Sequence, residues 1–267
     1  MKKIFFVILF TSALSFLNAQ TFEAGGSAGI SYYFGDLNTN ISFKHPGPTA
    51  GLVGRIVFND RLAFKLSANY ARLGFYDSYS KNEFQRARNL SFESHIIDGA
   101  AQLEFHFLKY IHGHEDHFFT PYLFGGPALF YFNPRTKYDG EWVALNPLGT
   151  EGQSRNSEYS LVQPAINYGL GFKFDLNIDW SINVEISGRA LFTDYLDDVS
   201  KHYVDRDELE YQRGELAAIL SDRSFEVVEA PIGEPGRQRG DEKSRDKYVL
   251  TGISLIYNFS RVKCPGF

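Results

Sequence analysis

Three histidines lie close together in the chain, at His112, His114 and His117, with Glu115 and Asp116 between them. Imidazole and carboxylate groups are ligands for zinc and nickel, so these residue types admit a metal site. No cysteine lies near them, and their spacing follows no helical repeat. A hydrophilic turn accounts for the same residues. We predict this turn without a metal ion or cofactor, and metal binding stays open as the alternative.

The segment 194–247 is strongly acidic. From Asp194 to Asp246 it contains 15 Asp or Glu and 8 Lys or Arg, a net charge of −7 against −5 for all 267 residues. Carboxylates are ligands that Ca²⁺ prefers, but the residue order of an EF-hand is absent, so calcium binding also stays open. The carboxylates that could hold the ion are Asp194, Asp197, Asp198, Asp205, Asp207 and Glu208. Within the segment, residues 206–221 favour a short helix.

The elements that must position these residues show a two-residue alternation of apolar and polar side chains. Trp180, Ile182 and Val184 alternate with Ser181 and Asn183, as in a β-strand whose successive side chains point to opposite faces. Phe, Tyr and Trp make up 16% of the chain and recur on the apolar faces, as in strands that face lipid between aromatic girdles. Eight segments carry the pattern: 22–34, 50–58, 61–72, 92–107, 119–132, 163–176, 179–193 and 248–259.

The connections between these segments alternate between long and short. The short or moderate ones are Asn59-Asp60, 109–118 and Asn177-Ile178, and the long ones are 35–49, 73–91, 133–162 and 194–247. This alternation predicts an all-β fold, an eight-stranded antiparallel transmembrane β-barrel with long extracellular loops and short periplasmic turns. A soluble lipocalin-like barrel is the alternative, but its outer face should be polar.

The polar faces of the predicted strands carry both acids and bases. Eight strands enclose a lumen that side chains can fill, so we expect these charges to pair there and to plug the barrel. The predicted inward set is Glu23, Arg55, Lys65, Asp98, Glu104, Lys173, Asp175, Glu185 and Arg189.

The two ends of the chain predict export. Lys2 and Lys3 precede a mostly apolar stretch, and the small residue Ala19 precedes the expected cleavage point, so residues 1–19 fit a secretory signal peptide. Residues 20–259 would then form a barrel in the cell outer membrane, in contact with its lipids. Residues 260–267 would form a periplasmic tail, with both termini in the periplasm. The mild net charge of −5 gives no reason to expect nucleic acid as a partner.

Catalysis would need a nucleophile or an activated water near a histidine and a carboxylate. The predicted outer loops offer His45, His95 and His202, but no Gly-x-Ser-x-Gly motif. We therefore predict that the protein is not an enzyme.

The single cysteine, Cys264, lies in the tail between Lys263 and Pro265. An unpaired cysteine in an exported protein indicates either a disulfide to a partner or a free thiol, and both stay open. Arg261 and Lys263 would lower the pKa of this thiol and raise its reactivity.

Several stretches together resemble the PorG-type outer-membrane barrels of the type IX secretion system, a DUF6089-like family. They are 29–38, 88–92, 101–105, 193–200 and the Lys-Cys-Pro sequence at 263–265. The resemblance implies a non-enzymatic barrel that anchors a periplasmic ring, built from a lipoprotein and its partner protein, to the outer membrane. It places the partner contact on the periplasmic side, at Asn59, Asp60, His112, His114, Asn177, Arg261, Lys263 and Cys264. The alternative is a small OmpW- or OmpA-like barrel that acts in transport or surface binding through its long outer loops.

Overall fold

The computed structural model describes residues 21–259. The predictions on the signal peptide 1–19 and on Arg261, Lys263 and Cys264 lie outside these residues.

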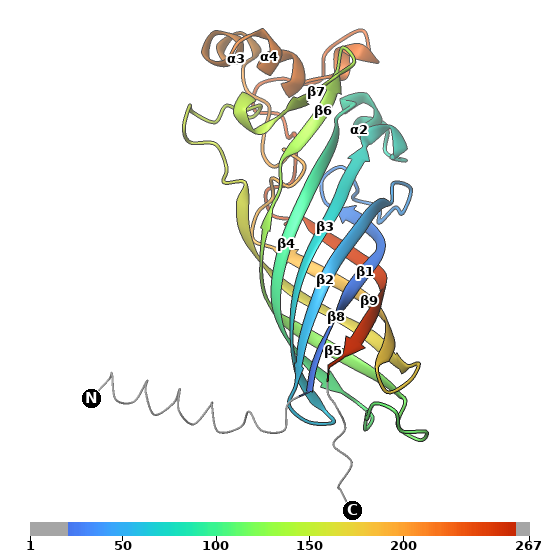
Figure 1. Cartoon of the computed structure of the whole chain (residues 1–267). Coiled ribbons are helices and arrows are strands. Elements are labelled where there is room, and N and C mark those ends of the chain that lie inside the picture. Colours follow the sequence, from blue (N-terminus) through green and yellow to red (C-terminus); the bar gives the residue numbers. More distant parts are fainter. Residues whose placement is uncertain (1–20, 260–267) are drawn as a thin grey trace, which may run out of the picture.

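Eight long strands form a closed antiparallel barrel (Figure 1). Each strand pairs with its neighbours in the chain, and β1 pairs with β10 to close the wall. The strands are β1 (Thr21–Phe34), β2 (Gly47–Val57), β3 (Leu62–Tyr76), β4 (Ser91–His106), β5 (Phe119–Tyr131), β8 (Val162–Asp175), β9 (Trp180–Leu191) and β10 (Lys247–Asn258). The prediction of an eight-stranded antiparallel barrel is therefore confirmed.

The seam between β1 and β10 is built on glycine. A Cβ atom on Gly29 would lie 1.9 Å from the backbone oxygen of Thr251, and one on Gly25 would lie 2.0 Å from that of Leu255. Since no side chain fits at such distances, the two strands approach each other this closely because both positions lack a Cβ.

The outer face of the wall is apolar. Leu52, Leu103 and Leu129 are 70%, 64% and 61% exposed, although each lies in a long strand and has a partner residue on both neighbouring strands. A water-facing wall would not present large apolar side chains on every strand, whereas a lipid-facing wall requires them. The lipocalin-like alternative is therefore wrong. Among the described residues, no helix is long and apolar enough to cross a membrane.

The two ends of the barrel differ in size. The turn end, which carries the segments 58–61, 107–118 and 176–179, has short connections and is the end where β1 begins and β10 ends (Figure 1). The loop end carries the segments 35–46, 77–90, 132–161 and 192–246, and we call these four segments together the cap.

The cap contains the remaining elements. They are the strands β6 (Pro134–Tyr138) and β7 (Glu141–Ala144), the helices α2 (Glu83–Arg88), α3 (Arg206–Arg213) and α4 (Glu215–Ser221), and the 3-10 turns η2 (Asp77–Tyr79), η3 (Asn146–Leu148) and η4 (Ser224–Glu226). The helix expected over 206–221 is thus two helices. They break at Gly214, whose φ of 97° lies in a region that glycine tolerates best. The β6–β7 hairpin was not predicted.

An apolar core joins the cap to the barrel. Leu196, Val199 and Leu220 of the cap pack in one cluster with Phe92 and Phe130, which point into the loop end of the lumen. The longest loop therefore folds down over the barrel mouth, and its apolar side chains close the loop end of the lumen.

Candidate functional site

The lumen contains an ion-pair network centred on Glu104. Its carboxylate lies 2.8 Å from Nε of Arg55, 2.9 Å from Nζ of Lys173 and 3.3 Å from Nζ of Lys65. All four side chains are at most 1% exposed. Because one carboxylate faces three cations, it holds together strands β2, β3, β4 and β8 across the lumen.

Further pairs extend this network in both directions. Arg55 also pairs with Glu23, Lys65 lies 2.9 Å from Glu185, and Arg189 lies 2.9 Å from Asp98. The nine charged residues predicted to point inward are all found in the lumen. The pairs around Glu104 fill the lumen nearer the turn end as a plug of opposite charges. The Asp98–Arg189 pair lies nearer the loop end, where Asp98 accepts a hydrogen bond from Tyr248 of the apolar core.

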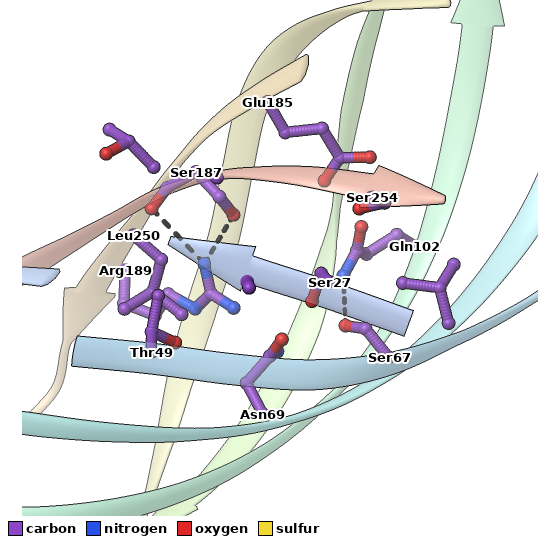
Figure 2. A pocket seen from close by; sticks show the side chains of 14 residues that line it. Ser27, Thr49, Ser67, Asn69, Gln102, Glu185, Ser187, Arg189, Leu250 and Ser254 are labelled. Carbon is purple, nitrogen blue, oxygen red and sulfur yellow. Dashed lines mark hydrogen bonds between the residues drawn. The ribbon is translucent and has the colours of Figure 1, made fainter. Parts of the chain in front are cut away.

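A small polar cavity of about 40 Å³ lies between the plug and the apolar core. Figure 2 shows the side chains that line this cavity. Ser27, Asn69, Gln102 and Arg189 line it, and Gln102 donates to Ser67 at 2.9 Å. This volume suits a few water molecules rather than a substrate.

His112 closes the turn end of the lumen. Its Nε2 lies 2.9 Å from Oε1 of Glu23, and its Nδ1 lies 2.7 Å from Oδ1 of Asp175. Burial by itself lowers the pKa of His112, but the two carboxylates outweigh it and raise that pKa to about 9. The imidazole is therefore a cation at neutral pH, and its two ion pairs join β1 to β8 across the turn end of the lumen.

The three histidines of the 112–117 segment do not come together. The ring centroids of His114 and His117 lie 4.6 Å apart on the hydrophilic turn, whereas His112 turns into the lumen. Among residues 21–259, no three His, Cys, Asp or Glu side chains converge so as to hold a metal ion. The expectation of a solvated turn thus holds for His114 and His117, and it is wrong for His112.

A pocket of about 380 Å³ opens beside His112 at the turn end. It brings together Asn59, Asp60 and His112, three of the residues predicted to contact a partner. The lining residues are Thr21, Glu23, Val57, Phe58, Asn59, Asp60, Lys109, Tyr110, Ile111, His112 and Asn258. His114 and Asn177 are not part of this lining.

Two of the predicted contact residues shape the turns that carry them. Oδ1 of Asn59 accepts hydrogen bonds from the backbone of Arg61 and Leu62, each at 2.9 Å. Asn177 does the same for Asp179 and Trp180, also at 2.9 Å. Their side-chain oxygens thus fix the turns, whereas the Asp60 carboxylate, 4.0 Å from Nζ of Lys109, is half exposed and accessible to a partner.

The cap contains a second charged network, which is mostly acidic. Within the part of the cap that the structure describes, seven acids are buried, and only two buried bases, Arg88 and Arg239, accompany them. Arg88 pairs with Asp77, and Arg239 pairs with Glu151 and lies 3.8 Å from Asp198. The other four acids have no base among residues 21–259 paired with them: Asp36, Asp194, Asp197 and Asp246.

The geometry of these four acids indicates bound protons. The Tyr33 hydroxyl donates to Asp197 and also lies 3.2 Å from Oδ1 of Asp246. One hydroxyl can donate only one proton, so the second contact is favourable when Asp246 itself carries a proton. Burial and the nearby negative charges raise the pKa of Asp246 well above its usual range. Burial and the charge of Asp36 raise the pKa of Asp194 to about 8.

The residues considered for calcium separate into two groups. Asp194, Asp197 and Asp198 turn inward and are buried in the cap. Asp205 instead caps α3, accepting a hydrogen bond at 2.9 Å from the backbone of Glu208. The clustering of Asp36 and Asp246 with the first group was not predicted, because these residues meet only when the loop folds over the mouth.

The histidines considered for catalysis also have separate partners. The ring of His45 packs on Tyr76, Nδ1 of His95 lies 2.6 Å from the hydroxyl of Tyr70, and His202 forms a backbone bridge with Gln238. No nucleophile is positioned by any of these contacts.

Comparison with solved structures finds outer-membrane barrels at low sequence identity. The chain is similar to Ail, the attachment invasion locus protein of Yersinia pestis, with 11% identity, 90% of this chain and 97% of that chain covered, and a TM-score of 0.41. It is also similar to Neisserial surface protein A, with 10% identity, 89% of this chain and 97% of that chain covered, and a TM-score of 0.43. A major outer membrane protein from Thermus thermophilus is similar as well, with 13% identity, 91% of this chain and 100% of that chain covered, and a TM-score of 0.43. At this level the likeness concerns the barrel fold alone.

Among curated proteins, no sequence matches this chain. Residues 2–217 match a family model described as a domain of unknown function, DUF6089. Because this match extends over most of the chain, the protein belongs to the DUF6089 family.

Proposed function

We propose that the protein is a non-enzymatic anchor in the outer membrane, with its turn end in the periplasm. Its partner would be the periplasmic lipoprotein ring of the type IX secretion system, as the resemblance to PorG-type barrels implies. The observation that carries the proposal is the turn-end pocket, which brings Asn59, Asp60 and His112 onto one surface.

The two closures of the lumen favour an anchor over a pore. The plug around Glu104 and the apolar core beneath the cap lie on either side of the small polar cavity. A barrel that conducts solutes would need a wider lumen than eight strands with filled interiors supply. The apolar exterior supports the contact with outer-membrane lipids.

The test is an affinity pull-down of the protein, tagged in the β6–β7 hairpin, from gently solubilised and crosslinked membranes. We expect periplasmic ring components to copurify in a defined ratio. The double variant Asp60→Ala/Lys109→Ala should reduce their recovery. The matched control, Glu242→Ala/Lys243→Ala, removes one exposed acid and one exposed base at the loop end and should not. A wild-type barrel recovered alone after crosslinking would refute the anchor.

The tail supplies a separate test. We propose that Cys264 forms a disulfide with a periplasmic partner. Non-reducing gels should then show a heavier band that disappears in Cys264→Ser. If the wild-type protein and Cys264→Ser migrate alike, the disulfide is excluded, and the anchor function is then tested by the pull-down alone.

A second candidate function is surface binding through the cap. Tyr211 on α3 is 93% exposed, which favours a contact site there. Tyr211→Ala changes only an exposed side chain; it should weaken binding to a cell surface and leave ring recovery in the pull-down unchanged, so the two measurements separate the two functions.

A further inference from the structure

The segment between β1 and β2 is a preformed loop. Nδ2 of the buried Asn38 donates to the backbone oxygens of Tyr33 at 2.7 Å and of Ser42 at 2.9 Å. Its Oδ1 accepts from the backbone nitrogen of Ser42 at 2.8 Å. One buried amide therefore closes residues 38–42 into a tight loop and determines where its tip points.

The tip of this loop presents apolar side chains. Ile41 has a φ of 48°, a conformation that β-branched residues rarely adopt, and it is 67% exposed. Phe43 is 60% exposed, and its ring packs edge-on against Tyr32 at 5.0 Å and Phe34 at 5.7 Å. Exposing an isoleucine side chain to water does not stabilise the fold, and neither does its strained backbone. Backbone strain of this kind is retained where it serves a contact.

The position of the loop places this tip at the membrane boundary. Tyr32 and Phe34 lie on the outward face of β1, in phase with the lipid-facing Ile30. In Figure 1 the blue segment joining β1 to β2 lies beside the barrel wall, lower than α2 and far below α3 and α4. Aromatic side chains at this level are typical of the interface between hydrocarbon and headgroups.

A pocket of about 430 Å³ lies between this loop and the segment that contains η2 and α2. Lys44 and Lys81 line it together with three residues that carry hydroxyl groups, Thr39, Ser42 and Ser80. Nζ of Lys44 donates to a backbone oxygen of Tyr79 at 3.2 Å. Within residues 21–259, neither lysine has an acidic partner. Two unneutralised ammonium groups beside hydroxyls suit a phosphate ester.

We propose that this pocket binds a phosphate group of a membrane glycolipid, with Ile41 and Phe43 inserted among its acyl chains. Under the orientation given in the proposed function, the lipid belongs to the outer leaflet and is of the phosphorylated lipid A class. The site lies at the opposite end of the barrel from the anchor surface. The ring contact can therefore fail while this site stands, and the reverse also holds.

The test compares lipids that differ only in phosphate. The full protein in detergent is titrated with phosphorylated lipid A, with dephosphorylated lipid A and with inorganic phosphate, and bound lipid is counted by native mass spectrometry. The variant Lys44→Ala/Lys81→Ala should bind phosphorylated lipid A roughly thirtyfold more weakly than wild type. The control Lys137→Ala/Lys243→Ala removes two exposed lysines from elsewhere in the cap and should bind like wild type.

A second variant addresses the apolar tip. Ile41→Gly suits the positive φ, so the barrel should keep its melting temperature in detergent while it retains less lipid A. Equal binding by the double-lysine variant and its control would overturn the proposal. So would equal binding of dephosphorylated lipid A, or saturation of the site by inorganic phosphate at the same concentrations.

Discussion

The lumen and the cap both bury many charged side chains, but they neutralise them differently. In the lumen five acids face four bases and the cationic His112, so each negative charge is matched by a positive one. In the described part of the cap, seven buried acids accompany only Arg88 and Arg239. The lumen is surrounded by lipid, where unpaired charge is prohibitive, whereas the cap lies near water and neutralises its acids with protons.

The largest expected effect comes from unbalancing the lumen. Glu104→Gln keeps the size of the side chain but leaves Arg55, Lys65 and Lys173 facing one another without their central anion. We expect a loss of about 3–5 kcal/mol in the free energy of unfolding, measured by denaturant titration in detergent. Glu115→Gln, on the exposed turn, serves as the control and should change it by about 0.5 kcal/mol or less. If Glu104→Gln lost as little free energy of unfolding as Glu115→Gln, the ion-pair network would not contribute to the stability of the barrel.

His112 should give the next largest effect. Replacing it with Gln removes a cation held between Glu23 and Asp175, at an expected cost of about 1.5–3 kcal/mol at pH 7. The folded-state pKa of about 9 lies above the usual 6.5, so this stability is complete below pH 6.5 and is lost as the pH rises through 9. Unfolding curves of wild type and His112→Gln should therefore converge above pH 9. A constant difference between them would contradict a protonated His112.

The stability of the cap should depend on pH over a different range from that of the His112 ion pairs. Its acids have raised pKa values, about 6 for Asp36 and about 8 for Asp194, so the folded cap binds more protons than the unfolded cap above pH 4. Its free energy of opening should fall as the pH rises from 4 to 8, by at most about 1.4 kcal/mol per pH unit for each proton. Hydrogen exchange, corrected for its intrinsic pH dependence, measures this. Cap protection that does not change with pH would show that the acids are neutralised otherwise.

The smallest effect should have the opposite sign from the first. Asp194→Asn removes a charge whose two carboxylate oxygens have no hydrogen-bond partner in the described part of the cap. We expect the cap to become more stable to opening by on the order of 1 kcal/mol at pH 8. Glu242→Gln, an exposed change in the same loop, should have no effect. A destabilised Asp194→Asn would mean that this carboxylate is needed in its charged form.

The wall and its inward charges could be predicted from the sequence because a strand has a period of two. Lys65 and Glu104 each fall out of phase with the apolar residues beside them, which assigns them to the lumen before any contact is known. The β6–β7 hairpin was missed, although Asp139-Gly140 is a strong turn signal, because strands of five and four residues are too short to show a clear alternation.

The cap could not be predicted in the same way. Asp36, Asp194 and Asp246 are far apart in the sequence, and each taken alone is an ordinary loop aspartate. Their shared burial follows from how the loop folds over the mouth, which no local pattern encodes. His112 was assigned to the solvent for the same reason, since its partners Glu23 and Asp175 become its neighbours only when the barrel closes.

The glycine-lined seam between β1 and β10 makes the last strand a test of whether the chain is complete. Until β10 arrives, both β1 and β9 keep one row of backbone amides and carbonyls without partners, and a bilayer does not tolerate such edges. A chain that stops short of Lys247 cannot close its wall, so it would remain outside the membrane and be exposed to proteolysis. The strand order therefore makes closure of the wall depend on the strand that is synthesised last.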